Sequence, residues 1–391
     1  MHVLALTPFY YGHTGGPTNE RLLLNTLSTK VDNLKIISLV PLKDFIKASR
    51  YRQKSTVACV ILIPSIKLLS PIIQLIISFV IIPVIFLFDF FKKPFKFIYV
   101  REVWFGFGLS LVNRTRKILM IKVPSALEEN PYFKDRLFYR LFRKFELCLY
   151  RFSLLRSRYV STYSTIMHGE LEKLLHIKRN DWMFLPPGID SKLLKKIKRR
   201  NTLFKKSFFR IGFIGWLTYW QGLDILVDAM KIVKEVIPNY ELFIVGDGPL
   251  RSYLENECKK TGIRYTVTGF INHEKALRYL STFDLLVVPR RRTPTIEGVI
   301  PLKVIEAWGL GVPVIVSPLK IYRLHGCTHG NEVFYSEPDS QSVANAILTI
   351  LSDSHLRENL KTNGYEASKK FNYAIIVEKL LKEVKGNEDL A

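Results

Sequence analysis

The sequence lacks most of the patterns by which metal, redox and nucleotide-hydrolysis chemistry are recognised. Its four cysteines, Cys59, Cys148, Cys258 and Cys327, lie far apart and follow no ligand spacing, so we expect neither a metal site nor a disulfide framework, and a reducing compartment is the default. No Asp-x-Asp pair occurs, which argues against a divalent metal holding a diphosphate. No Gly-Lys dipeptide occurs either, which excludes a Walker P-loop. We therefore expect no metal and no cofactor.

The length and the pattern of apolar residues predict two α/β domains. The chain has 391 residues and 48% apolar content, enough for two hydrophobic cores, and it shows neither a sequence repeat nor a low-complexity tract. A signal peptide is not evident, because a strand is predicted from His2 on. Short apolar runs alternate with helical patterns. Strands are predicted at His2–Leu6, Leu34–Leu39, Phe97–Val100, Leu119–Val123, Tyr159–Thr162, Phe209–Ile214, Tyr240–Val245, Arg264–Thr268, Leu285–Val288 and Val312–Val316, and helices near the C-terminus around Ser342–Leu351 and Ser368–Val384.

The most informative run is Leu285–Pro318, where a helix begins just after a buried strand. Pro301 suits the first helical turn, and Gly309 with Gly311 ends the helix before the next strand. The backbone donors near Leu302 and Lys303 are therefore free and point outward. Such a helix start, at the carboxyl end of a parallel strand, binds phosphate through its N–H groups and its dipole.

Two glutamates flank this helix start. Glu297 precedes it, and Glu306 follows one turn inside. A carboxylate beside a phosphate is repelled, so both acids must face hydroxyl groups, which donate to an acceptor-only ion. The pattern indicates a docking site for a nucleotide sugar.

The run EGVIPLKVIEAWGLGVPVIVS resembles the paired-glutamate signature of retaining GT-B glycosyltransferases of the GT4 type. The resemblance implies two Rossmann-like domains whose parallel sheets face each other across a cleft. It places Glu297 at the transferred sugar, the amides around Leu302 at the distal phosphate, and Glu306 at the ribose. The two acids are nine positions apart where the family usually has eight, and the extra residue falls in the stretch Gly298, Val299 and Ile300, which is expected to line the donor site.

Three further runs resemble the same family in its usual order. They are Ile211–Met230, with Gly215 and Gln221; Val245–Glu255, with Gly246; and Val267–Pro289, in which Phe270 and Ile271 are expected to hold the base. Many relatives carry an arginine and a lysine where this chain has Trp216 and Gln221, so the cationic half of the diphosphate clamp is missing. Arg290, Arg291, Arg292 and Lys303 are the candidates to supply the charge, and Arg290, directly after the strand, is favoured.

The N-terminal run MHVLALTPFYYGHTGGPTNERLLLNTL resembles the first strand, glycine turn and helix of the family. Gly15 and Gly16 allow close backbone approach and are expected to face the donor. His13 lies in the same loop and is a candidate catalytic residue, although an exposed loop histidine is more often inert. Many relatives have a catalytic histidine later in this domain, but the matching run here, KVPSALEENP, has none, which leaves Glu128 or Glu129 as a weak alternative.

A second strong signal is the apolar segment of residues 57–91. Leu68–Phe88 contains no charge, and sixteen of its twenty-one residues are Leu, Ile, Val or Phe. A single membrane crossing meets the length rule, but it would split one sheet across the bilayer. A re-entrant hairpin or an in-plane helix pair broken at Pro71 and Pro83 is expected, with a helix pair buried in its own domain as the alternative.

The charge distribution favours a membrane surface. Residues 1–187 contain 28 Lys and Arg against 12 Asp and Glu, whereas residues 188–391 contain 30 against 22. Anionic lipid attracts such a basic excess. Nucleic acid is the rival explanation, but no recognition motif is present, so we expect no nucleic-acid partner.

These observations predict a retaining glycosyltransferase that moves a hexose-type sugar from UDP or GDP to a lipid-linked or cell-surface glycan acceptor, in polysaccharide or glycolipid biosynthesis. The alternative is a catalytically silent GT-B subunit that binds a partner enzyme or a lipid. The expected partners are the nucleotide-sugar donor, the acceptor and an anionic membrane surface, and the expected location is peripheral, on the cytoplasmic face of the cell membrane. The predicted domains are 1–187 on the acceptor side, a linker at 188–206, 207–368 for the donor, and a helix at 369–391 that returns to the first domain.

Overall fold

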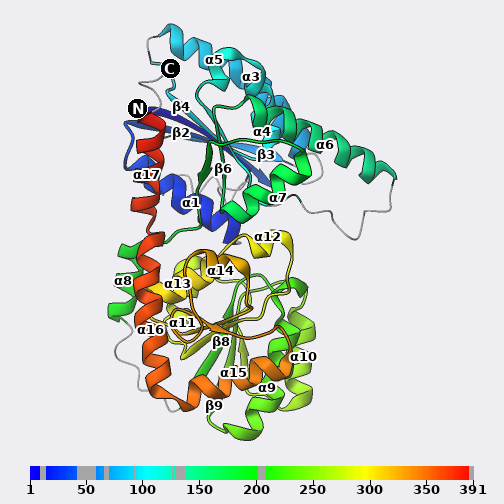
Figure 1. Cartoon of the computed structure of the whole chain (residues 1–391), viewed down its shortest axis with the longest axis vertical. Coiled ribbons are helices and arrows are strands. Elements are labelled where there is room, and N and C mark those ends of the chain that lie inside the picture. The colour runs from blue at the N-terminus through cyan, green and yellow to red at the C-terminus, as the bar shows by residue number, and fades with distance from the viewer. Residues whose placement is uncertain are drawn as a thin grey trace. The chain divides into compact units, whose positions relative to one another are not determined.

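The structure is a computed structural model of the whole chain (Figure 1), and it describes residues 1–8, 15–41, 59–65, 70–91, 93–125, 127, 137–200 and 208–386. The chain divides into two compact units. Unit 1 holds most of the first 186 residues together with the chain from Ile376 on, and unit 2 holds the chain from Pro187 to Ile375.

Unit 1 is built on a seven-stranded sheet with the strand order β3-β2-β1-β4-β5-β6-β7, and the pairings between its strands are parallel. The strands are β1 (His2–Thr7), β2 (Asn33–Pro41), β3 (Cys59–Ser65), β4 (Phe97–Arg101), β5 (Leu119–Lys122), β6 (Tyr159–Thr162) and β7 (Trp182–Phe184). The helices are α1 (Gly15–Ser28), α3 (Ser70–Phe90), α4 (Val103–Leu111), α5 (Asn113–Arg116), α6 (Leu137–Arg156), α7 (Thr165–Leu175) and, from Ile376 on, α17 (Tyr373–Gly386).

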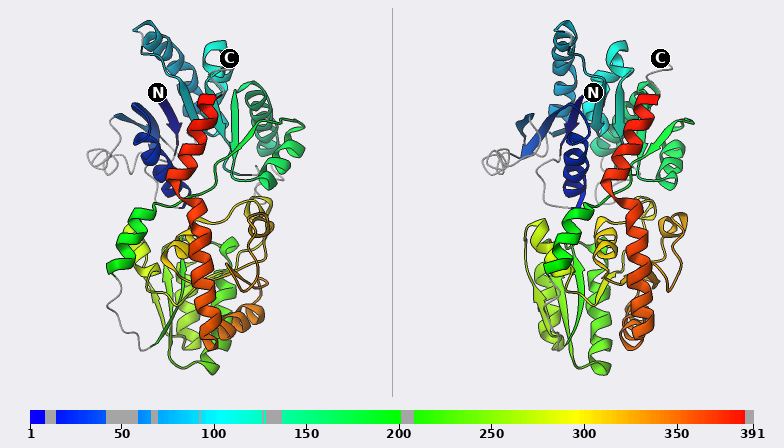
Figure 2. Two further views of the ribbon diagram at one scale, coloured as in Figure 1. Left: turned by 60° about the vertical axis from the view of Figure 1, so that its left-hand side comes forward. Right: turned by 90° about the vertical axis from the view of Figure 1, so that its left-hand side faces the viewer.

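Helices cover both faces of this sheet, as its buried strands require. Leu4, Ile98 and Ile121 project to the face packed by α3, α4, α6 and α7. The opposite face carries α1 and α17 (Figure 2), and the Tyr159 hydroxyl on β6 donates to the carbonyl oxygen of Val384 in α17 at 3.3 Å.

In its described part, residues 59–65 and 70–91, the apolar segment forms a strand and a single long helix, so the predicted helix pair and re-entrant hairpin were wrong. Its first part is β3, which pairs with β2 alone and is therefore an edge strand, where Pro64 is tolerated. Its second part is the single helix α3, which begins at Ser70 and accommodates Pro83 in its interior. Pro71 lies in the first turn, where a missing N–H group costs nothing.

Helix α3 packs closely on α4 and leaves one apolar side exposed. The two helices meet at Ser78 and Gly108, where the Gly108 amide donates to the Ser78 hydroxyl at 3.1 Å and a Cβ atom on Gly108 would lie 2.5 Å from that oxygen. The buried residues of α3 are Gln74, Ser78, Ile81 and Ile85. By length and composition, α3 is the one helix in the described part of the chain that is apolar enough to cross a membrane, and 22% of its most apolar window is buried.

Unit 2 contains a six-stranded parallel sheet with the order β10-β9-β8-β11-β12-β13. Its strands are β8 (Phe209–Ile214), β9 (Tyr240–Val245), β10 (Tyr265–Val267), β11 (Leu285–Val288), β12 (Val314–Val316) and β13 (Phe334–Tyr335). The helical segments are α8 (Ser191–Arg200), η3 (Tyr219–Gln221), α9 (Leu223–Val236), α10 (Arg251–Thr261), α11 (His273–Leu280), α12 (Pro294–Glu297), α13 (Leu302–Leu310), α14 (Lys320–Leu324), α15 (Ser340–Ser352), α16 (Ser354–Ser368) and η4 (Lys369–Phe371).

The predicted fold class is confirmed, because both sheets have the strand order of a doubly wound Rossmann domain. All ten predicted strands are present, with ends shifted by no more than two residues. The strands β3, β7 and β13 were not predicted. The stretch expected to be a linker, 188–206, contains the helix α8.

Candidate functional site

The candidate site lies at the carboxyl edge of the unit 2 sheet, where β8 and β11 are neighbours. In this strand order the chain connections leave β8 and β11 in opposite directions, so this is the topological switch point of the sheet. Ligands of doubly wound sheets bind in the crevice outside the strands at this point. Gly215 follows β8 directly, and Pro289 and Arg290 follow β11.

The helix α13 begins at the same edge with unsatisfied backbone donors. Pro301 occupies the N-cap position and supplies no side-chain cap. The N–H groups of Val304 and Ile305 donate to the carbonyl oxygen of Pro301, whereas no acceptor is recorded for those of Leu302 and Lys303 within the described residues. This is the arrangement that binds a phosphate oxygen.

Arg290 carries a buried guanidinium group without an acidic partner. Its Nε and Nη1 atoms are buried and form no hydrogen bond in the described part of the chain. Burial lowers the pKa of Arg290 from its ordinary value, with the Tyr322 hydroxyl acting in the other direction. A buried charge that is left uncompensated costs free energy, so such a group at a switch point marks a candidate anion-binding site.

The neighbouring arginines are engaged elsewhere. Arg291 forms two hydrogen bonds with the carboxylate of Asp224, at 3.0 and 2.6 Å, and donates to the carbonyl oxygen of Tyr219 at 2.7 Å. Arg292 is half exposed and lies 3.8 Å from Glu297 and 3.7 Å from Glu337. Of the three candidates in this run, Arg290 alone has no carboxylate within ion-pair distance among the described residues.

Lys303 supplies a second cation at the switch point. Its Nζ atom lies 3.3 Å from the Oε1 atom of Gln221 and 3.7 Å from the centre of the Phe213 ring. Gly215 has a φ of 133°, a conformation that favours glycine, and a Cβ atom there would lie 2.8 Å from this Nζ atom. Burial, and then the nearby Arg290, hold the pKa of Lys303 well below its usual range, with Glu306 acting in the opposite direction.

The side chain of Gln221 is therefore a neutral hydrogen-bond acceptor for the Lys303 ammonium group. A lysine at position 221 would bring a second ammonium group against Lys303, and like charges at this distance repel. At this edge of the sheet the basic side chains of Arg290 and Lys303 come from the end of β11 and from α13.

Glu306 is buried on the first turns of α13 and pairs with a histidine. Its Oε1 atom lies 2.6 Å from the Nε2 atom of His273, the first residue of α11. His273 was not predicted as a site residue, although it lies in the run expected to hold the base. Sequence order gives no sign of the pairing, because the two residues are 33 positions apart and on different helices.

Glu297 is tied to the protein by both carboxylate oxygens. Oε2 accepts a hydrogen bond from the backbone N–H of Lys320, at the start of α14, at 2.7 Å, and Oε1 lies 3.8 Å from Nε of Arg292. Its side chain is 14% exposed. These contacts leave other lone pairs of the carboxylate available to accept from a hydroxyl group. The contact of Glu297 with a transferred sugar is compatible with them and stays a prediction.

The remaining predicted donor residues of unit 2 surround this edge. Gly246 packs so tightly on Gly215 that a Cβ atom would lie 2.0 Å from the Gly215 carbonyl oxygen. Phe270 is 53% exposed after β10, and Ile271 is half-buried. In the loop between α12 and α13, Gly298 and Ile300 are buried and Val299 is half-buried.

Unit 1 carries a buried charge cluster at the carboxyl ends of β4 and β5. Glu20 on α1 lies 2.8 Å from Arg101 and 3.8 Å from Lys122. Burial raises the pKa of Glu20, but Lys122 and Arg101 together outweigh it, so the net shift is downward. Gly16, at the start of α1, faces this cluster, since a Cβ atom there would lie 3.4 Å from Nη2 of Arg101.

Glu102, next to this cluster, was not predicted as a site residue. It follows β4 with a φ of 74° and a ψ of 148°, a conformation that non-glycine residues rarely adopt. Burial raises the pKa of Glu102 to about 7, with Arg101 opposing the shift. Gly15 is the first residue of α1. His13, Glu128 and Glu129 lie outside the described residues.

Comparison with known proteins agrees with the fold. Sucrose-phosphate synthase of Thermosynechococcus elongatus matches with a TM-score of 0.71 at 18% identity over 100% of both chains. Anabaena HepE in complex with UDP matches with a TM-score of 0.72 at 16% identity, over 99% of this chain and 100% of that one. At such identities the likeness shows the fold, which is that of GT-B glycosyltransferases.

Residues 195–367 match the family model described as Glycosyl transferases group 1. An uncharacterized glycosyltransferase of Methanocaldococcus jannaschii is 31% identical over 199 residues, 49% of this chain and 48% of that protein. A phosphatidyl-myo-inositol mannosyltransferase of Mycobacterium leprae is 24% identical over 169 residues, 41% of this chain and 42% of that protein. The chain thus matches about half the length, or less, of these curated relatives.

Proposed function

We propose that the protein is a retaining glycosyltransferase that moves a hexose-type sugar from a nucleoside diphosphate, UDP or GDP, to a lipid-linked or cell-surface glycan acceptor. The observation that carries this proposal is the pair of cations at the switch point of unit 2. Arg290 has no acidic partner in the described chain, and Lys303 is held with a depressed pKa beside it. A diphosphate brings the negative charge that both side chains lack.

The donor would lie with its phosphates at the start of α13. The free N–H groups of Leu302 and Lys303 would bind the distal phosphate, and the side chain of Arg290 would reach its oxygens. Glu306, held in place by His273, would accept hydrogen bonds from the ribose hydroxyls, and Phe270 would pack against the base. HepE of Anabaena, which shares the fold, is known in complex with UDP, and this supports a uridine or related donor.

The reaction needs stabilisation of the leaving group more than a protein nucleophile. As the bond between the sugar and the diphosphate breaks, negative charge gathers on the distal phosphate. The α13 amides, Arg290 and Lys303 are fixed before the reaction and stabilise that charge without reorganising. The departing phosphate would then assist removal of the proton from the acceptor hydroxyl, and Glu297 would orient the sugar.

The acceptor is proposed to be membrane-bound. Two similar proteins are named for such substrates: the phosphatidyl-myo-inositol mannosyltransferase of Mycobacterium leprae and a lipopolysaccharide core biosynthesis glycosyltransferase of Rhizobium meliloti, 33% identical over 144 residues. The exposed apolar side of α3 and the basic excess of residues 1–187 support a peripheral location at an anionic membrane.

Slow hydrolysis of the donor without an acceptor tests the activity. A panel of UDP- and GDP-sugars is incubated with the full chain, and release of the nucleoside diphosphate is measured. The proposal predicts release from at least one donor and its loss in Lys303→Met. The alternative is a catalytically silent subunit, suggested by Trp216 and Gln221, and it predicts no release from any donor. Absence of a thermal shift with every donor would favour that alternative.

A further inference from the structure

Unit 1 contains a basic pocket at the edge of its sheet that the proposed reaction does not use. The pocket is open, with a volume of about 440 Å³, and it is lined by Arg116, Lys117, Arg156, Arg158, Lys178 and Arg179. Lys117 shortly precedes β5, Arg158 directly precedes β6, and Asp181, which also lines the pocket, directly precedes β7. The pocket therefore lies at the amino ends of these strands, whereas doubly wound sheets bind substrates at the carboxyl ends.

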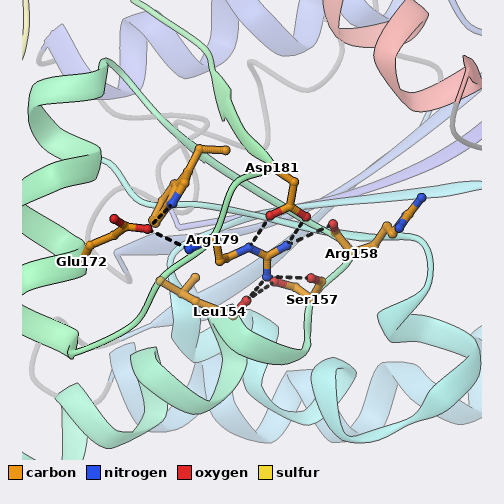
Figure 3. A network of polar contacts seen from close by, with 7 residues as sticks. Leu154, Ser157, Arg158, Glu172, Arg179 and Asp181 are labelled. Atoms are coloured by element: carbon orange, nitrogen blue, oxygen red, sulfur yellow. Dashed lines mark hydrogen bonds and ion pairs between the residues drawn. The ribbon is translucent and has the colours of Figure 1, made fainter.

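Arg179 organises this pocket and is itself fully engaged. Its Nε and Nη2 atoms donate to the carboxylate of Asp181 at 2.9 and 2.7 Å, and the guanidinium group also donates to the carbonyl oxygens of Leu154, Ser157 and Arg158 (Figure 3). These bonds neutralise the one acid of the pocket and fix the turn between α6 and β6.

The other basic residues keep their charge uncompensated. Arg156 donates to the carbonyl oxygens of Ser110 and Leu111, at 3.0 and 3.4 Å, which are neutral groups. No carboxylate lies within 4.0 Å of Arg116, Lys117, Arg158 or Lys178 in the described part of the chain. The pocket is thus strongly positive and suited to an anion of two or more oxygens.

The pocket borders a continuous apolar surface. Leu155, which is 50% exposed, lines the pocket, and Phe152 lies one turn before it on α6. The Phe152 ring lies 5.6 Å from that of Phe107 on α4, and Phe107 lies 6.3 Å from Phe79 on α3, both between ring centres. An apolar path therefore leads from the pocket across three helices to the exposed side of α3.

The end of α3 also reaches the pocket edge of the sheet. Asp89, near the end of α3, forms two hydrogen bonds with Arg114 at 2.9 and 3.0 Å, and Arg114 lies on the short helix α5 that ends at Arg116. Phe90 is 79% exposed, and Leu87 is 54% exposed. Strongly exposed aromatic and aliphatic residues beside a cluster of free cations form the pattern of a surface that enters the headgroup region of a bilayer.

We propose that this pocket binds the phosphate headgroup of an anionic membrane phospholipid, while α3 and the exposed face of α6 enter the acyl region of the same leaflet. A soluble phosphate would use the cations but not the apolar surface, and a bilayer satisfies both. RNA is less suited, because exposed aliphatic side chains, among them Ile72, Ile76 and Val80, lie between the exposed rings of α3, and aliphatic side chains do not stack on bases. The proposal rests on the membrane location in the proposed function and not on its donor site.

Vesicle flotation with the full chain tests this proposal. Vesicles of phosphatidylcholine are compared with vesicles that also contain phosphatidylglycerol, and the wild type is expected to float with the mixed vesicles alone. Lys117→Gln/Lys178→Gln should bind the mixed vesicles roughly thirtyfold more weakly, because each basic residue near an anionic surface contributes about fivefold. The matched control is Lys195→Gln/Lys196→Gln on α8, which removes two exposed lysines from unit 2 and should bind like the wild type.

A second variant separates the apolar contribution from the electrostatic one. Leu87→Ser/Phe90→Ser keeps the pocket intact and should lose the part of the binding that resists high salt. Equal binding of the wild type to both vesicle types, or equal binding of the pocket variant and its control, would overturn the proposal. So would binding to an RNA oligonucleotide that the pocket variant loses while no vesicle is bound. Thermal shifts with nucleotide sugars, measured on each variant, separate a failure here from a failure of the glycosyltransferase proposal.

Discussion

Replacing Arg290 with methionine should make the free protein more stable and the nucleotide complex weaker. The guanidinium group has two buried nitrogen atoms without an acceptor, and its charge lies near that of Lys303. Methionine has no charge to desolvate. The substitution keeps the backbone contacts of position 290, including the hydrogen bond that the Arg290 carbonyl oxygen accepts from the Ser317 hydroxyl at 2.8 Å.

The magnitudes follow from the same contacts. A buried polar group without a partner costs about 1–3 kcal/mol, so Arg290→Met should raise the free energy of unfolding of the free protein by about 1 kcal/mol or more. That corresponds to a rise in Tm of about 2–4 °C for each kcal/mol in a domain of this size. A hydrogen bond to a charged group contributes about 1.5–3 kcal/mol, so the Kd for the nucleoside diphosphate should rise roughly 10- to 150-fold.

Thermal unfolding without ligand and calorimetric titration with UDP and GDP measure the two effects on one preparation. Arg323→Met is the matched control, because Arg323 is an exposed arginine of α14 in the same unit and should change neither quantity. A lower Tm together with unchanged nucleotide affinity in Arg290→Met would refute the reasoning and make Arg290 a structural residue.

Three further predictions concern other acids and the lysine of the site. Glu306→Ala should lower the affinity for UDP about tenfold or more and abolish the preference for UDP over 2′-deoxy-UDP in competition binding. Glu297→Gln should instead keep the affinity for the nucleotide and lower the turnover of the donor, and the reverse pattern would exchange the two roles. The affinity for UDP should fall as pH rises through the depressed pKa of Lys303, because a bound diphosphate favours the ammonium form and binding then takes up a proton. Calorimetry in buffers of different ionisation enthalpy measures this proton uptake, and Lys303→Met should remove it. Glu102 has a folded pKa of about 7 against an ordinary 4.5, so between these pH values it is protonated in the folded state and ionised in the unfolded state; the free energy of unfolding should therefore fall by up to about 3 kcal/mol as pH rises from 4.5 to about 7. Glu102→Gln should remove this fall, and a constant difference between the variant and the wild type across pH 4.5–7 in denaturant titrations would contradict the assignment.

The sequence predicted the strands of both sheets because most are buried on both faces and appear as short apolar runs. The exceptions have physical causes. The strand β3 was hidden by the apolar run that continues into α3. The end strands β7 and β13 have only three and two residues, so neither shows a bounded run of its own. The length of α3 could not be predicted either, because Pro83 normally interrupts a helix in water.

The candidate site could be located in the sequence where one local pattern defines it, as at the start of α13 and at Glu306. It was not predictable where distant segments meet. His273 reaches Glu306 from another helix, and the contact of Lys303 with Gln221 joins residues 82 positions apart. The position directly after the strand favoured Arg290 over Arg291 and Arg292, and their partners in the fold distinguish the three by contact.

The most direct test of the central claim is a binding series that varies the phosphates alone. Calorimetric titration of the wild type with UMP, UDP, GMP and GDP reports whether the switch-point edge of unit 2 recognises a diphosphate. We predict that the diphosphate of the preferred base binds at least tenfold more tightly than its monophosphate, and that Arg290→Met removes most of this difference. Equal affinity for monophosphate and diphosphate, or no binding of either base, would contradict the account.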